Sequence, residues 1–149
     1  MKSFLALTAL AALCHSAYCF TKGTYTIGSA SLDKTMVLTE VTGQEDLEFR
    51  KSNGHPAQIW DFTKDSNNAE YFVVTNNIGG SITCPELDSL CIVDDGEAPT
   101  SFRPEYVGGQ NYELVASGSG YSLQLAAGNK LKLAEYESGH DQEFVLTQT

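Results

Sequence analysis

The side chains that could take part in chemistry are few and lie far apart along the chain. Cys84 and Cys91 have no histidine beside them, so they fall short of a metal-ligand set. His55 and His140 each follow a glycine in matching turns, which we expect to be solvated and on different lobes. The acidic run 94–97 lacks the alternating ligand spacing of a calcium loop. The sequence therefore predicts no metal site and no cofactor.

Catalytic residues are not predicted either. Acyl transfer needs a nucleophile beside a base that a third group holds, and no serine here lies in a nucleophile-elbow sequence. The 19 Asp and Glu residues leave room for a carboxylate pair of the kind that hydrolyses glycosides, but such abundance is more typical of a solvated surface. We therefore expect a protein that is not an enzyme.

The first 19 residues have the pattern of a secretory signal peptide. Lys2 supplies a positive start, an apolar run follows, and small residues end it. The run is too short to span a bilayer. Cleavage after Cys19 would place Ala17 and Cys19 at the recognised positions, whereas cleavage after Ala17 would leave Cys19 as an unpaired thiol. We predict a secreted protein whose mature part is a single domain of residues 20–149.

Cleavage after Cys19 leaves two cysteines, Cys84 and Cys91, in the mature chain. An even number suits a disulfide in an oxidising compartment. By loop-closure entropy, a bond across so short a loop would contribute roughly 2–3 kcal/mol. That contribution helps the domain without defining it, so the fold must rest on its core.

The charge of the chain restricts its partners. The formal net charge is −10, and it becomes −11 once Lys2 is removed, because 8 of the 9 basic residues then face 19 acidic ones. Such a surface repels phosphate backbones and anionic lipid headgroups. We therefore expect no nucleic-acid and no membrane partner, while neutral ligands and basic proteins remain open.

A turn that ends in a large aromatic residue occurs three times. Trp60, Phe102 and Phe144 are each 42 residues apart, and each follows a glycine, a hydrogen-bonding residue and a spacer. A fixed period of that size indicates a repeat architecture. We interpret the three aromatic residues as core residues related by pseudo-threefold symmetry. The repeats cover about residues 23–66, 67–109 and 110–149.

Each repeat has the pattern of four short strands, and no stretch shows a helical apolar period. Alternation of the kind that a half-buried strand requires is visible in pairs such as Tyr25 and Ile27. Asp94-Asp95-Gly96 predicts a hairpin turn between the third and fourth strands of the second repeat, and Gly128-Asn129 predicts one inside the third. The twelve predicted strands lie near residues 25–27, 36–38, 47–49, 59–62, 71–74, 81–83, 90–93, 101–103, 112–115, 121–125, 130–133 and 143–146.

Twelve short strands at about ten-residue spacing predict an all-β barrel or sandwich. A unit of four strands cannot bury its apolar face alone, so three units must close around a common axis. Closure also removes exposed strand edges. We therefore predict an all-β fold, the β-trefoil, with twelve short strands in three pseudo-symmetric repeats that form a six-stranded barrel capped by three hairpins.

The repeats resemble those of the ricin-B-like β-trefoil lectins, in particular the small secreted fungal type. The matching residues are Gln58-Ile59-Trp60 and Gln142-Glu143-Phe144, with a degraded copy at Thr100-Ser101-Phe102. The similarity covers essentially the whole mature chain and implies carbohydrate binding. The tripeptide mostly builds the core, and the same scaffold also carries protease inhibitors and other binders.

In the sugar-binding repeats of that family, an aspartate fixes two sugar hydroxyls, a polar residue precedes the glutamine, and an aromatic side chain stacks on the sugar ring. The third repeat is the one that keeps two hydrogen-bonding residues beside its glutamine. By strand position, the aspartate's place is taken here by Val37, Thr83 and Gln124, and the place before the glutamine by Ala57, Pro99 and Asp141.

The resemblance therefore implies a glycan site in the third repeat. Gln124, Asp141 and Gln142 could supply donors and acceptors, and Tyr136 or Tyr121 could present a ring face to the C–H groups of a sugar. The alternative interpretation is that Gln142 binds the backbone and that Tyr136 merely caps the barrel edge.

The leading hypothesis is a secreted, non-catalytic protein that binds a glycan or glycoprotein through a shallow site. A second hypothesis is a secreted β-trefoil inhibitor that blocks a peptidase with a surface loop. The connections 77–80 and 108–110 suit that role, because glycine lets backbones approach closely. A third is an effector-like protein-interaction domain whose sugar sites have decayed.

Overall fold

The computed structural model describes residues 20–41, 46–94 and 98–149. The predicted signal peptide and most of the predicted turn at 94–96 lie outside these residues. In the part that is described, no helix is long and apolar enough to cross a membrane. The strands are β1 Gly23–Ser29, β2 Met36–Glu40, β3 Leu47–Lys51, β4 Trp60–Lys64, β5 Phe72–Asn76, β6 Ser81–Thr83, β7 Ile92–Asp94, β8 Ser101–Gly108, β9 Asn111–Ala116, β10 Ser122–Ala126, β11 Lys130–Ala134 and β12 Phe144–Gln148.

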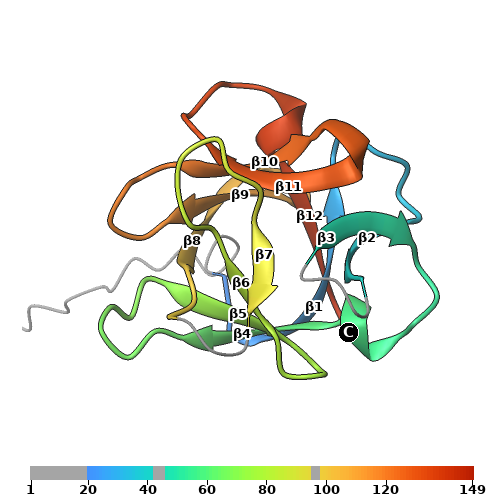
Figure 1. The fold of residues 1–149 in the computed structure, drawn as a ribbon, viewed down its shortest axis with the longest axis horizontal. Helices are drawn as coiled ribbons and strands as arrows, with labels where there is room; N and C mark the ends of the chain where they lie inside the picture. Colours follow the sequence, from blue (N-terminus) through green and yellow to red (C-terminus); the bar gives the residue numbers. More distant parts are fainter. Residues whose placement is uncertain (1–19, 42–45, 95–97) are drawn as a thin grey trace, which may run out of the picture.

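Six of these strands form a closed ring, as Figure 1 shows. β1 pairs with β4, and the antiparallel pairing continues through β5, β8, β9 and β12 back to β1. The other six form three hairpins, β2–β3, β6–β7 and β10–β11. Each hairpin leaves the end of one barrel strand and returns to the start of the next, so the three lie at one end of the barrel. This is the β-trefoil, and the predicted fold is confirmed.

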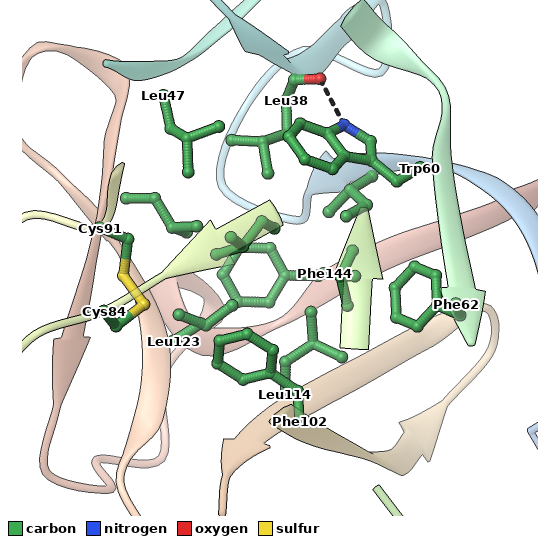
Figure 2. Packing of buried hydrophobic residues seen from close by; sticks show 14 of the residues in the cluster. Leu38, Leu47, Trp60, Phe62, Cys84, Cys91, Phe102, Leu114, Leu123 and Phe144 are labelled. Carbon is green, nitrogen blue, oxygen red and sulfur yellow. Dashed lines mark hydrogen bonds between the residues drawn. A yellow bond between two sulfur atoms is a disulfide. The ribbon is translucent and has the colours of Figure 1, made fainter. Parts of the chain in front are cut away.

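The register of the barrel strands shows the threefold repetition directly. The motif aromatics Trp60, Phe102 and Phe144 are all fully buried and belong to one cluster. Their rings lie together in the interior in Figure 2, where the Trp60 indole Nε1 donates a hydrogen bond of 3.0 Å to the Leu38 carbonyl. In each repeat the motif aromatic pairs with an aromatic residue of the first strand, in the pairs Tyr25–Trp60, Phe72–Phe102 and Tyr112–Phe144. The prediction of three core residues is confirmed.

The end of the barrel opposite the hairpins is covered by Phe20. Its ring centroid lies 4.9 Å from Tyr25, 5.1 Å from both Phe62 and Phe72, and 5.6 Å from Tyr112. These four residues belong to the barrel strands β1, β4, β5 and β9, which come from all three repeats. A residue directly before the first strand therefore completes the core.

Two predicted turns have different outcomes. The turn at Gly128-Asn129 joins β10 to β11, and both residues have the positive φ that a tight hairpin needs, 73° and 58°. The turn predicted at 94–96 lies mostly outside the described residues. The strands on either side of it are not partners of each other, since β7 pairs with β6 whereas β8 pairs with β5 and β9.

Candidate functional site

The motif glutamines Gln58 and Gln142 hold the connection that leads into the fourth strand of their repeat. Gln142 is buried; its Oε1 accepts from the Glu137 N–H and its Nε2 donates to the Glu135 carbonyl, both at 2.7 Å. Gln58 makes the same pair of bonds to Asn53 and Lys51, at 2.9 and 3.1 Å. Gln142 therefore binds backbone through both ends of its amide, as the alternative interpretation of the sequence expected.

The second repeat uses different chemistry at the corresponding place. Thr100 Oγ1 accepts from the Cys84 N–H at 2.9 Å, and Cys84 is bonded to Cys91 as predicted. The loop between the two cysteines lies against β11, where the Asp88 N–H and the Cys91 N–H bind β11 carbonyls at 2.8 Å. This repeat thus holds its chain with a disulfide and presents no motif glutamine.

The strand register shifts one of the three places assigned to the family's aspartate. In each hairpin one fully buried residue pairs with a buried partner, in the pairs Leu38–Phe49, Ile82–Val93 and Leu123–Leu133. The residues that follow in the first strands are Thr39, Thr83 and Gln124, so Thr39 rather than Val37 is the counterpart of Gln124. Val37 and Thr39 are two residues apart and so lie on the same face of β2, and the pairing partners decide which of them corresponds to Gln124.

Gln124 is the longest polar side chain at this place and the one that remains half-exposed. Thr39 is buried, and its hydroxyl accepts from Gln58 Nε2 at 3.1 Å and donates to the Val37 carbonyl at 2.9 Å. Thr83 is buried as well. Of the three repeats, the third therefore has the side chain best able to meet a ligand here.

The structure places Asp141 and Tyr136 on either side of β12. Asp141, in the 3-10 helix η3 (His140–Gln142), accepts a hydrogen bond of 2.6 Å from the hydroxyl of Ser31, which follows β1. Tyr136 is 60% exposed, and its hydroxyl acts on the carboxyl of Glu113 in β9. β12 lies between β1 and β9 in the sheet. Gln124 comes from β10, which packs against η3, where Asp141 lies, and pairs with β9, where Glu113 contacts Tyr136.

Tyr121 lies elsewhere. It is half-buried and lines a pocket of about 410 Å³ between the second and third repeats, together with Asp65, Ser101 and Ser117. Gln124, Asp141 and Tyr136 do not line that pocket. Of the five predicted glycan residues, Asp141 and Tyr136 are thus exposed and Gln124 half-exposed, Gln142 is a buried glutamine, and Tyr121 lines a separate pocket.

Acidic side chains that the sequence did not single out lie beside Tyr136. Burial raises the pKa of the Glu113 carboxyl above its ordinary value, Glu105 and Glu143 raise it further, and the Tyr136 hydroxyl opposes the rise. Glu143 accepts from Asn111 Nδ2 at 2.9 Å and lies 3.4 Å from His140 Nδ1. Together these groups supply hydrogen-bond acceptors next to an exposed ring.

The sequence carried no signal for the burial of Glu113. Alternation with Tyr112 and Leu114 assigns it correctly to the outer face of β9, where a carboxylate would ordinarily be solvated. The segment around Tyr136 comes from the other end of the repeat and reaches this face only in the folded chain. Among the described residues, no group of three or more His, Cys, Asp or Glu residues is placed to hold a metal ion.

Comparison with known proteins identifies the fold. No family model matches the chain, and no curated protein matches its sequence. Among solved structures, the chain is similar to the Macrolepiota procera ricin B-like lectin in complex with lactose, with 13% identity over 88% of this chain and 99% of that one and a TM-score of 0.71. The Rhizoctonia solani agglutinin is 15% identical over 88% and 98%, also with a TM-score of 0.71.

A proteinase inhibitor from Coprinopsis cinerea is equally similar in shape, with 10% identity over 88% of this chain and 100% of that one and a TM-score of 0.70. At identities this low, the structural similarity demonstrates a common fold only, and the function has to be argued from the residues of the site. The chain is a β-trefoil protein whose fold is shared by ricin-B-like lectins and a proteinase inhibitor.

Proposed function

We propose that this protein is a secreted, non-catalytic carbohydrate-binding protein whose glycan site lies in the third repeat. The observation that carries the proposal is the exposed ring of Tyr136 beside the Glu113 carboxyl of β9, a strand that pairs with β10, which carries Gln124 and packs against η3. An aromatic face next to a few polar groups is the composition that orients a sugar, because sugars present C–H groups on one face and hydroxyls at the edge.

Asp141 has the position expected of a ligand acceptor. Ser31 binds its Oδ1, which fixes the orientation of the carboxylate, and within the described residues its Oδ2 accepts no hydrogen bond. A carboxylate held in this way can accept a ligand hydroxyl without first losing much side-chain freedom. We assign Asp141 and Gln124 to the hydroxyls of the sugar and Tyr136 to its C–H face.

The test is a glycan array with the mature protein and two variants, Asp141→Ala and Tyr136→Ala. We expect each variant to weaken binding about tenfold or more, since hydrogen bonds to a charged acceptor are stronger than neutral ones. Asp61→Ala is the matched control, because Asp61 accepts a comparable bond from the Thr63 hydroxyl at 3.0 Å on β4. A blank array, or binding that both variants leave unchanged, would contradict the proposal.

A second candidate function is peptidase inhibition through the loop at residues 77–80. The buried side chain of Asn76 holds this loop, since its Oδ1 accepts from the Ile78 N–H at 3.1 Å and the Gly80 N–H at 2.9 Å, and its Nδ2 binds Glu40. Ile78, at the tip, is 50% exposed. A rigid loop with an apolar tip suits insertion into an enzyme cleft, because little freedom is lost on binding.

Inhibition assays against trypsin-like and papain-like peptidases separate the two candidates. A blank array together with inhibition that Ile78→Asp abolishes would support the inhibitor. Array binding with no inhibition would support the carbohydrate-binding protein.

A further inference from the structure

A second pocket lies at the end of the barrel that Phe20 covers, away from the hairpins. It has a volume of about 480 Å³, and we call it the barrel-end pocket. Its walls come from the segment before β1, the turn between β8 and β9, and the last residues of β12. The side chains that matter for binding are Phe20, Tyr25, Tyr112, Gln110, Thr147 and Gln148.

Phe20 and Tyr112, both half-buried, form the aromatic wall of this pocket, and the buried ring of Tyr25 supports Phe20 from below. Phe20 stacks on Tyr25 with centroids 4.9 Å apart and meets Tyr112 edge to face at 5.6 Å. The Tyr25 hydroxyl donates to the Thr21 carbonyl at 2.8 Å, which ties the segment before β1 to the ring below it. The rings are thus held in place before any ligand arrives, so little conformational entropy is lost on binding.

Two amide side chains stand at the rim. Gln110 lies in the β8–β9 turn and Gln148 is the last residue of β12; both are exposed, and within the described residues neither side chain has a hydrogen-bond partner. Each amide carries donors and an acceptor. No Asp, Glu, Lys or Arg side chain lines the pocket although the chain has a net charge of −10, and the charge expected beside it is the α-amino group that the predicted cleavage leaves on Phe20. The chemistry of the pocket therefore fits an uncharged ligand with hydroxyl groups and an apolar face.

We propose that the barrel-end pocket is a binding site for one or two rings of a neutral saccharide. The C–H face of the sugar lies on the aromatic wall, and neighbouring hydroxyls bind the amides of Gln110 and Gln148. A compact pocket suits a sugar ring better than an extended proline-rich peptide, which needs an elongated aromatic groove.

This site is independent of the one proposed in the third repeat. Gln148 stands at the last residue of β12, whereas Asp141 lies just before its first residue, so the two sites are separated by roughly the length of that strand, about 13 Å. A monomer with both sites would bind two glycans and cross-link surfaces that carry them.

The test is an NMR titration of the mature protein with lactose, cellobiose and chitotriose, each followed through the side-chain amide signals of Gln110 and Gln148. We expect at least one sugar to shift these signals, and Gln148→Ala and Gln110→Ala each to raise the Kd about 2- to 10-fold, the effect of losing one neutral hydrogen bond. Asn67→Ala removes an exposed amide elsewhere and is the matched control.

The same titration in Asp141→Ala separates this proposal from the third-repeat site. Shifts at Gln110 and Gln148 that persist in Asp141→Ala support the barrel-end pocket whatever the outcome of the glycan array. Shifts that occur with a proline decamer and with none of the three sugars would overturn the assignment in favour of a peptide site. An absence of shifts with all four probes would overturn the pocket as a binding site.

Discussion

The second repeat differs from the first and third in the way it holds its chain. In the first and third, a buried glutamine bonds two backbone groups, five and seven residues earlier, in the connection to the fourth strand. In the second, Thr100 is too short for that reach and binds Cys84 instead, while a disulfide closes the loop from Cys84 to Cys91.

The difference shows which parts of the repeat the barrel requires. All three repeats keep a fully buried aromatic residue at the start of the fourth strand, because those rings fill one shared interior. The bond that holds the adjacent chain is local to each repeat, so one chemistry can replace another there. A glutamine in this motif is therefore evidence for the fold and not for a ligand.

Removal of the disulfide tests the covalent side of this comparison and should have the largest effect. The double variant Cys84→Ser, Cys91→Ser should lose roughly 2–3 kcal/mol of unfolding free energy, because the unfolded chain regains the entropy of the loop. Guanidinium melts measure the loss. Reductant should have no further effect on the variant, and a loss below about 1 kcal/mol would show that the loop is held by its contacts with β11.

The glutamine side of the comparison is tested by Gln58→Ala and Gln142→Ala. Each should cost about 1–3 kcal/mol in denaturant melts, since each leaves a backbone N–H and a backbone carbonyl without their partners. Thr100→Ala is the corresponding change in the second repeat and should cost less, about 1 kcal/mol, because of the two bonds between its hydroxyl and Cys84 one, to the carbonyl, is long at 3.5 Å. A larger cost for Thr100→Ala than for either glutamine would reverse this account.

Glu113 distinguishes the third repeat, since the strand register places Thr26 and Val73 at the same point of the other two. Burial, then Glu105 and Glu143, raise its folded-state pKa above the ordinary value of 4.5. The folded protein therefore binds this proton more tightly than the unfolded chain, and stability falls as pH rises from about 4.5 through the raised pKa.

Glu113→Gln should remove the fall of unfolding free energy with rising pH. We expect this change to be smaller than those of the disulfide and glutamine variants. The variant should be more stable than the parent protein at pH 7 and equal to it near pH 4 or below, in urea melts across this range. Thr26→Val, at the equivalent place in the first repeat, keeps Glu113, so its stability should fall with pH as the parent's does and the difference between the two should not change with pH. A variant that is less stable at pH 7 would show that the ionised carboxylate is stabilised by its neighbours.

The sequence by itself determined the architecture of this protein. A period of 42 residues and local alternation specify twelve strands, and the three cross-strand pairs of aromatic residues follow from closing three such units into one barrel. The disulfide followed from the even number of cysteines in the predicted mature chain. These features depend on the spacing of residues and on an even number of cysteines, both of which can be read from the sequence without knowing any tertiary contact.

Tertiary structure alone decided the site. Alternation tells which face of a strand a residue occupies, but not which distant segment covers that face. The burial of Glu113 beside Tyr136 and the position of Phe20 over the barrel end therefore could not be predicted from the sequence. The exchange of Val37 for Thr39, two residues further along the same face of β2, has the same cause, since the position that matches Gln124 is known only from the pairing partners. Whether a polar side chain meets a ligand or its own backbone, as Gln142 does, depends on contacts between elements that only folding brings together.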